Sequence, residues 1–426
     1  MTSLDWPIGV RFVDLAAGLE AITGIERYLR IRVFASHGRR LLGSADIWTY
    51  GAPAISVERL RDVLALRFGF SLLEQHLRAR WGPDREQARL SPTLVSIVLP
   101  SCDREDDLRR CLVSLVAQQT RHRLEIIVVD NRPSTRTARR VAQEFAGVVV
   151  VDERRPGLSY ARNAGILHAR GEIVVATDDD VVAPTHWIET LLEPFVEPQV
   201  SAVTGHVLPL ELETQAQCRF ESYGGLGKGF DRVEFGSGWF HHRRSAVPTW
   251  LIGATANAAF RAAIFRVPGI GLMDEALGAG TPTGCSEDTY AFYRILKTGG
   301  TIVYSPDAYV WHRHRASMRD VRRQIYAYSK GHVAYHLTTL LRDADRRALV
   351  RLAYSLPKTY AGRALARLRR QSDYPLASLL VEIAGNCAGP FALWRSRRRV
   401  RKLGVSVPVR NHAVSLESPI AQGPPR

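Results

Sequence analysis

Cysteine is scarce and scattered in this chain of 426 residues. Its five cysteines lie far apart, and no two of them form a C-x-x-C pair: Cys102, Cys111, Cys218, Cys285 and Cys387. This spacing fits neither a structural zinc site nor a disulfide framework. We therefore expect a protein of a reducing compartment, with a core large enough to fold without cross-links.

Long apolar runs are also missing. The first residues, Met1–Gly9, contain an aspartate and a proline and lack the apolar segment of a secretory signal. The nearest approach to a membrane span is Leu376–Trp394, which Glu382 and Asn386 interrupt. A central acidic residue makes membrane insertion less favourable by about 2.5–3.5 kcal/mol. We therefore expect this stretch to form a buried or interfacial helix.

Acidic residues are outnumbered by basic ones. The chain has 58 Lys and Arg against 42 Asp and Glu, which gives a formal net charge of +16. Its 46% hydrophobic and 23% charged residues are ordinary for a globular protein and exclude a mostly disordered, collagen-like or coiled-coil chain. The basic excess predicts an anionic partner, which could be nucleic acid, an acidic membrane face or a phosphorylated small molecule.

Composition divides the chain into four parts. Residues 1–90 have the pattern of a small α+β unit, because Tyr28–Ala35 alternates like a half-buried strand. The sequence leaves open whether this unit is a separate interaction module or packs against the rest. Residues 94–316 form the main domain. Residues 317–402 are helical and very basic, and residues 403–426 are predicted to be disordered.

The main domain contains short apolar runs separated by helical patterns. Four runs predict strands covered on both faces: Val95–Leu99, Ile126–Val129, Val148–Val151 and Glu172–Ala176. This alternation predicts a parallel sheet with right-handed crossovers. Ligands of such sheets bind beyond the carboxyl ends of the strands. Three segments are thus expected on one edge: Pro100–Asp103, where Asp103 is also placed to cap a helix, Asp130 and Asp178–Asp180.

The trio Asp178–Asp180 carries the strongest chemical signal. Three carboxylates at the end of an apolar strand repel one another, and such clustering favours a hard divalent cation that also binds waters and phosphates. Strand geometry would point Asp178 and Asp180 to the same side. The alternative is a solvated acidic loop with a helix-capping role.

Other candidate residues also have structural alternatives. Glu287 and Asp288 open a predicted helix, where they act either as capping carboxylates or as a general base. Asp130 is either a turn residue or an acceptor for a ligand's base or sugar. Arg162 opens another helix and either binds phosphate or lies on a wet face. His312, in the segment WHRH, is either structural or a metal ligand.

Taken together, these segments resemble the family 2 glycosyltransferases, which have the GT-A fold. The resemblance runs from Val95 to about Gly331 and comprises eight segments in the family's order: VSIVLPSCDRED, EIIVVDN, GLSYARNAG, GEIVVATDDDV, GATANAAFR, MDEALGAG, SEDTYAFYRILKTGG and SPDAYVWHRH. It implies an α/β fold with a Rossmann-like mixed sheet and helices on both faces. The small N-terminal α+β unit and the basic C-terminal helical region lie beside that fold.

The resemblance also implies residue roles. Asp178 and Asp180 match the outer positions of the family's D-x-D motif, and Asp288 matches its usual base. The implied roles are nucleotide-sugar binding by Pro100, Asp103, Asp130, Arg162, Asp178 and Asp179; metal binding by Asp180, Asp178 and His312; and catalysis by Asp288 and Glu287. The implied cofactor is Mg²⁺ or Mn²⁺, which would bridge to the donor's pyrophosphate.

The implied activity is transfer of one sugar, with inversion, from a nucleoside-diphosphate sugar to an acceptor hydroxyl. The acceptor would be a glycan, a lipid-linked molecule or a small molecule. The Q-x-x-R-W motif of processive synthases is absent, which favours a single transfer. We expect a cytoplasmic, bacterial-type enzyme, with peripheral attachment to an anionic membrane surface at the inner face of the plasma membrane as a further option. No nucleic acid partner is expected.

The alternative is a basic membrane- or nucleic-acid-binding protein whose GT-A-like domain is inactive. The net charge favours it, but few aromatic residues interleave the Arg-rich tail, and single-strand binders need such stacking platforms. Nucleotidyl transfer on a similar sheet is a third reading. It is disfavoured because Ser101–Arg104 lacks a glycine-rich loop.

Overall fold

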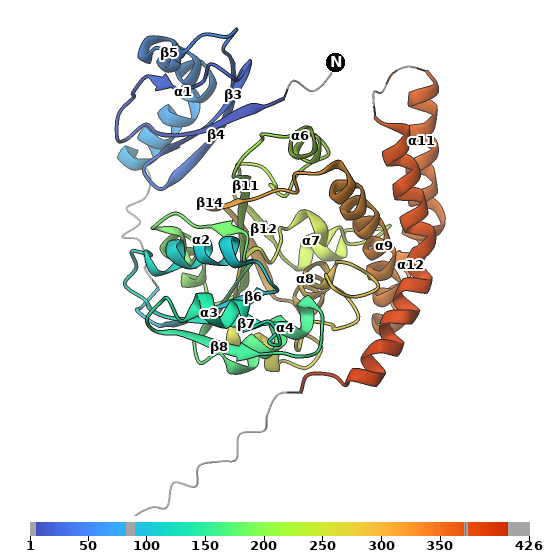
Figure 1. Ribbon diagram of the computed structural model, residues 1–426. Helices are drawn as coiled ribbons and strands as arrows, with labels where there is room; N and C mark the ends of the chain where they lie inside the picture. The colour runs from blue at the N-terminus through green and yellow to red at the C-terminus, as the bar shows by residue number, and fades with distance from the viewer. Residues whose placement is uncertain (1–5, 82–89, 370, 372–373, 408–426) are drawn as a thin grey trace, which may run out of the picture.

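The computed structural model describes residues 6–81, 90–369, 371 and 374–407. The disorder expected from residue 408 onward lies outside these residues. Along the chain, an N-terminal sheet, a large central sheet and a group of C-terminal helices follow one another (Figure 1).

The N-terminal part is a three-stranded sheet covered by one helix. Its elements are β1 (Ile8–Asp14), β2 (Ile22–Thr23), β3 (Arg30–His37), β4 (Arg40–Trp48), β5 (Ala54–Ile55) and α1 (Val57–Trp81). β3 and β4 form an antiparallel hairpin, β1 runs parallel to β3, and β2 pairs with β5. The strand predicted over Tyr28–Ala35 is therefore confirmed. Leu60, Leu64 and Phe68 of α1 bury their side chains in the core under this sheet.

This N-terminal sheet packs against the central sheet. The Ile8 amide donates a hydrogen bond to the Leu212 carbonyl at 2.9 Å, and the Leu41 amide donates to Asp307 Oδ1 at 2.8 Å. One buried apolar cluster joins side chains of both sheets: Phe34, Leu41, Leu208 and Tyr309. The structure thus decides a question that the sequence left open.

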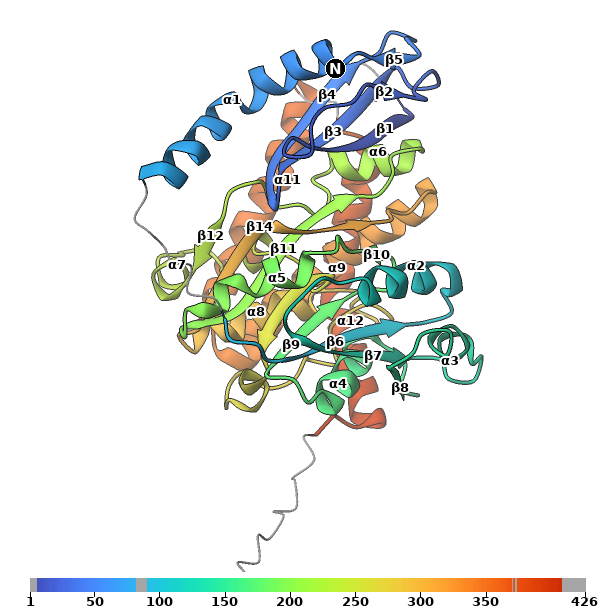
Figure 2. The same ribbon diagram turned by 90° about the vertical axis from the view of Figure 1, so that its left-hand side faces the viewer.

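The central sheet has nine strands with the order β10-β14-β11-β13-β9-β6-β7-β8, and β12 pairs with β14 (Figure 2). Their bounds are β6 (Leu94–Ser101), β7 (Arg123–Asp130), β8 (Val148–Asp152), β9 (Ile173–Thr177), β10 (Val181–Val182), β11 (Val200–Pro209), β12 (Val233–Phe235), β13 (Asn257–Arg261) and β14 (Thr301–His312). β6 to β9 are mutually parallel, as predicted. β13 is antiparallel to both neighbours, so the sheet is mixed.

Helices cover both faces of this sheet because neighbouring residues of each strand point to opposite sides. Val98 and Ile127 face a core that contains Phe292 of α8, whereas Ile97 and Val128 face a second core under α2. The helices up to α8 are α2 (Glu105–Val116), α3 (Thr137–Ala142), α4 (Leu158–His168), α5 (Trp187–Leu192), α6 (Gln215–Ser222), α7 (Ser237–His241) and α8 (Glu287–Lys297).

The basic C-terminal region forms long helices along one side of the molecule (Figure 1). They are α9 (Met318–Asp343), α10 (Arg347–Val350), α11 (Leu356–Leu368) and α12 (Leu376–Leu403). Gly385 and Gly389 let α12 approach α9 closely, since a Cβ at either would lie 2.6–2.7 Å from the nearest α9 atom. By length and composition, α12 is also the single helix of the described chain that could cross a membrane, which is weak evidence for a span.

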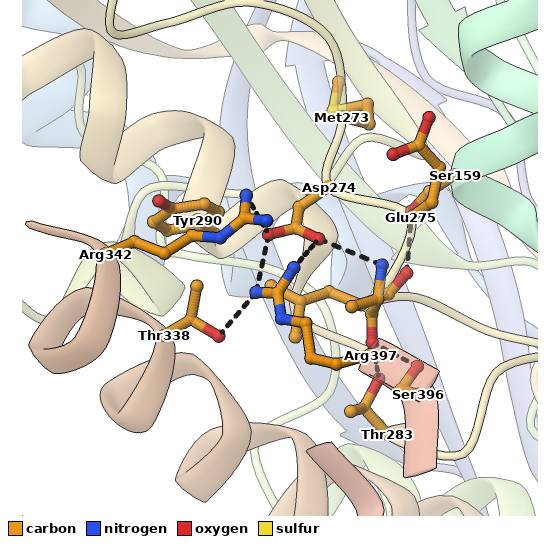
Figure 3. Close-up of polar contacts among 12 residues, drawn as sticks. Ser159, Met273, Asp274, Glu275, Thr283, Tyr290, Thr338, Arg342, Ser396 and Arg397 are labelled. Atoms are coloured by element: carbon orange, nitrogen blue, oxygen red, sulfur yellow. Dashed lines mark hydrogen bonds and ion pairs between the residues drawn. The ribbon is translucent and has the colours of Figure 1, made fainter. Parts of the chain in front are cut away.

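A buried ion cluster ties these helices to the loop that precedes α8 (Figure 3). Asp274 accepts two hydrogen bonds from Arg397 of α12 at 2.7 and 2.8 Å, and it pairs with Arg342 of α9 at 3.2 Å. Burial alone would raise the pKa of Asp274, but the two arginines hold it below its ordinary value. The Ser396 hydroxyl adds a bond to the Ala276 carbonyl at 2.6 Å.

We expect Asp274→Ala to destabilise the protein by about 3 kcal/mol, because it leaves two arginines without their buried carboxylate. Denaturant unfolding measures this loss. The pKa of Asp274 in the folded protein is lowered from 3.8. Its ionised form therefore contributes to the free energy of unfolding above about pH 3.8, and this contribution is lost as the pH falls through the lowered pKa. Asp62→Asn is the matched control, because its pair with Arg61 is exposed, and it should cost less than about 0.5 kcal/mol. Equal effects would contradict the role of the cluster.

Candidate active site

A cleft of about 1600 Å³ opens beyond the carboxyl ends of β6 and β9. Its lining joins segments from distant parts of the sequence, from the strand ends near Pro100 and Asp178 through the start of α8 to α9, α11 and α12. Ligand cavities usually measure about 300–1000 Å³. This cleft therefore has room for more than one small molecule.

Arg162 of α4 links the two acidic segments that the sequence singled out. The residue is 1% exposed, and its guanidinium donates to Asp178 Oδ1 at 2.7 Å and to Glu287 Oε1 at 2.6 Å. A single arginine side chain thus connects the loop after β9 to the start of α8. Arg162 Nε has no partner among the described residues, so the side chain is engaged only through its two outer nitrogens.

Glu287 and Asp288 differ in their surroundings although they are adjacent. Glu287 is 5% exposed. Burial and the charge of Asp288 raise its pKa to about 7, against the opposing effect of Arg162. Asp288 is only partly buried, lines the cleft and accepts the Thr289 amide at 2.6 Å. Asp288 is therefore the carboxylate with better access to a ligand.

Asp179 and Asp180 share Arg104, the residue before α2. Arg104 Nη1 lies 3.2 Å from Asp179 and also contacts Asp180. Asp179 further accepts the Ser101 hydroxyl at 2.8 Å, and burial raises its pKa to about 7. Burial would raise the pKa of Asp180 as well, but His312 and Arg104 lower it. Asp180 is thus ionised beside Arg104 and His312.

His312 connects Asp180 to a short chain of polar groups. Its Nε2 lies 3.2 Å from Asp180 Oδ1, and its Nδ1 lies 3.2 Å from Nδ1 of His314. His314 Nε2 in turn contacts Glu221 of α6 at 2.8 Å. Burial would lower the pKa of His312, but Asp180 and Asp178 raise it. Glu221 and His314 therefore orient His312 toward the aspartate.

The expectation that Asp178 and Asp180 face one way by strand alternation is wrong. β9 ends at Thr177, so the pleat does not extend over the trio. Asp178 binds Arg162, whereas Asp180 binds Arg104 and His312. Accordingly, within the described residues no three His, Cys, Asp or Glu side chains converge as a metal site.

A metal ion would therefore have two protein donors here, Asp180 and His312. Their 3.2 Å separation allows both to bind one cation. Mg²⁺ typically binds one or two carboxylates and completes its shell with waters and substrate phosphates. The donors present fit a cation that arrives with a phosphorylated substrate better than a permanently bound one.

Not all of the residues assigned to the nucleotide sugar line the cleft. Pro100 lines the cleft, but Asp103 and Asp130 are not part of its lining. Asp103 does not cap α2, because its φ of +57° turns the side chain to Arg132 and Thr135. Asp130 Oδ2 is buried without a hydrogen-bond partner in the described chain, and burial raises the pKa of Asp130.

Sequence reasoning missed several cleft residues. Arg104 received no role although it stands in the segment VSIVLPSCDRED, and Glu221 lies outside every segment of the resemblance. Lys228, in the glycine-rich segment Gly224–Gly229, lines the cleft and has no ion-pair partner within the described residues. Burial lowers its pKa, and Asp288 opposes that shift. The glycine-rich pattern around a lysine was the signal that could have found it.

Known proteins that are similar to this chain include several glycosyltransferases. The model of glycosyl transferase family 2 matches residues 96–265. The pre-mycofactocin glycosyltransferase of Mycobacterium tuberculosis is 25% identical over 321 residues, which are 72% of this chain and 62% of that protein. The succinoglycan biosynthesis protein ExoM of Rhizobium meliloti is 28% identical over 214 residues, 49% of this chain and 63% of that protein. The chain thus spans under two thirds of these relatives' lengths.

Among solved structures, a mannosyltransferase from Pyrobaculum calidifontis in complex with GDP-Man and Mn²⁺ has a TM-score of 0.42. It is 18% identical, and the match covers 81% of this chain and 86% of that one. Residues 96–265, which match the family model, include β6 to β9, β11, β13 and Asp178–Asp180. These strands belong to a mixed sheet with helices on both faces, as the resemblance implied. The segment 96–265 is therefore similar to glycosyl transferase family 2, in agreement with the resemblance noted in the sequence.

Proposed function

We propose that the protein transfers one sugar from a nucleoside-diphosphate sugar to an acceptor hydroxyl, with inversion at the anomeric carbon. The single observation that carries this proposal is the Arg162 bridge. It holds the acidic loop after β9 and the Glu287–Asp288 pair at the wall of one cleft. A binding protein with an inactive domain would have no need for that juxtaposition of carboxylates.

In this proposal the chain's own residues perform three tasks. Pro100, Asn131 and the loop at Arg132 flank the donor's base and ribose. Asp288 accepts the proton of the acceptor hydroxyl as that oxygen attacks the anomeric carbon from the face opposite the leaving diphosphate. Arg162 keeps Glu287 in place beside Asp288, and no covalent sugar–enzyme intermediate is required.

Asp180 and His312 are the residues that would hold Mg²⁺ or Mn²⁺, with Asp178 nearby. The metal, when bound, would neutralise charge on the diphosphate as a Lewis acid. We propose cytoplasmic location. The acceptor would occupy the part of the cleft that α9, α11 and α12 line through Gln324, Tyr360 and Asn386. These polar side chains suit a hydroxyl-rich or lipid-linked acceptor.

We expect Asp288→Asn to reduce transfer by about 10²–10⁴-fold, because the acceptor hydroxyl loses its base, while donor binding persists. Asp180→Asn should instead abolish the Mn²⁺-dependent part of donor binding. A screen of nucleotide sugars for protection against thermal unfolding, with and without Mn²⁺, identifies the donor and separates the two effects.

Asp152→Asn provides a matched control, because Asp152 ends β8 in the same sheet but pairs with Arg139 outside the cleft. It should retain activity and donor binding. Retention of most activity in both the Asp180 and Asp288 variants would overturn the proposed mechanism.

The rate should depend on pH through the Glu287–Asp288 pair. Since the pKa of Glu287 is raised to about 7, Glu287 takes up a proton as the pH falls through 7 and loses its charged contact with Arg162. The rate should therefore fall below that pH, because Glu287 is no longer held in place beside Asp288. Glu287→Gln removes the like charge while keeping an oxygen for Arg162, so the acid limb should move to lower pH. An unmoved limb in the pH–rate profile of this variant would contradict the assignment.

Lys228 should contact an anionic group of a substrate, because it is a partly buried cation of the cleft without a carboxylate partner in the described chain. A lost hydrogen bond to a charged group costs about 1.5–3 kcal/mol. Lys228→Met should therefore raise KM by about tenfold or more for the donor if the group is its diphosphate, or for the acceptor if not. Lys358→Met, on the exposed face of α11, should leave the KM values for donor and acceptor unchanged. If Lys228→Met also left both KM values unchanged, the contact with an anionic group would be excluded.

A further inference from the structure

One face of α12 carries a continuous row of exposed apolar side chains. The residues recur at intervals of three or four, which places them on one side of the helix, and they are 38–60% exposed: Leu376, Leu380, Ile383, Phe391 and Trp394. The exposed Cys387 fills the gap in the row. At 1.5 Å per residue the row is about 27 Å long. An apolar surface of this length normally has a partner.

The opposite face of α12 is fixed to the protein. Ser378, Leu379 and Leu393 are buried there, and Gly385 and Gly389 sit against α9. Glu382, the one acidic residue of the helix, points inward and is 2% exposed. It accepts hydrogen bonds from Arg363 and Tyr360, each at 2.8 Å. Because one face is held in this way, α12 can lie on a membrane surface with its opposite face.

The apolar row ends in a basic groove of about 440 Å³. Its described lining combines apolar and cationic side chains and contains no acidic residue: Pro156, Phe391, Trp394, Arg395, Arg398, Arg399, Lys402 and Leu403. The guanidinium of Arg398 lies 4.9 Å from the ring centroid of Trp394, and that of Arg395 lies 5.8 Å from the ring of Phe391. Aromatic rings beside arginine side chains suit the headgroup level of a membrane.

We propose that α12 docks the protein peripherally on a membrane rich in anionic phospholipid. The apolar row would enter the headgroup–acyl boundary, and the basic groove would bind the lipid phosphates. Charge complementarity favours this occupant over a second copy of the chain, since the outer face of α12 offers no carboxylate with which a copy's arginines could pair. Each basic residue near an anionic surface adds to binding, and salt weakens that part.

Flotation of the full chain with vesicles tests the proposal without donor or acceptor, so its outcome is independent of the proposed reaction. We expect binding to vesicles of phosphatidylglycerol mixed with phosphatidylcholine, at least about tenfold weaker binding to phosphatidylcholine alone, and loss of the difference at high salt. Equal binding to both vesicles, or to neither, would overturn the proposal.

Two matched pairs of variants locate the surface. Leu380→Gln with Phe391→Gln should weaken binding about tenfold or more, whereas Leu66→Gln with Phe70→Gln should not. These controls are exposed apolar residues of α1, where acidic and basic residues are mixed. Likewise, Arg395→Gln with Arg398→Gln should weaken binding, and Arg61→Gln with Arg67→Gln should not. Circular dichroism confirms that each variant is folded.

Equal losses from the α1 and α12 variants would exclude α12 as the docking face. A change of oligomeric state in size-exclusion chromatography, caused by the apolar α12 variants without vesicles, would instead assign the row to an interface between copies of the chain.

Discussion

The site depends on a buried guanidinium placed among carboxylates. Arg162 joins Asp178 to Glu287, and without it the charges of the acidic loop and of the α8 start would repel across a poorly solvated space. Burying an arginine is unfavourable unless its charge is matched. Here two carboxylates match it, and a third, Asp288, remains directed to the cleft. One interaction therefore both stabilises the site and sets the spacing of its acidic groups.

A second set of contacts extends this organisation to the C-terminal helices. Asp274 connects the loop before α8 to α9 and α12, so the position of Glu287 and Asp288 depends on helices outside the family domain. The same helices line part of the cleft and present the apolar row of α12 to the outside. The cleft and the apolar row thus lie on two faces of one packed layer.

Local patterns predicted the central fold well, because each strand of β6 to β9 is a short apolar run that needs cover on both faces. The family resemblance also singled out Asp178–Asp180 and Glu287–Asp288, which the structure joins through Arg162. Local patterns failed at Asp103, which has a left-handed backbone conformation and does not form the expected helix cap. They also failed at the direction of the Asp178 side chain, because the residue at which a strand ends is not apparent where an apolar run passes into a polar one.

The sequence by itself determined which residue types end each strand, the parallel run of β6 to β9 and the excess of positive charge, since these follow from order and composition alone. Only the tertiary structure decided which cation each carboxylate meets, that the N-terminal sheet packs on the central one, and that Glu382 faces inward while Phe391 and Trp394 face outward. Such outcomes depend on contacts between separate elements, such as that of Arg162 with Glu287, 125 positions apart. Helix and strand periodicities carry no information about such contacts.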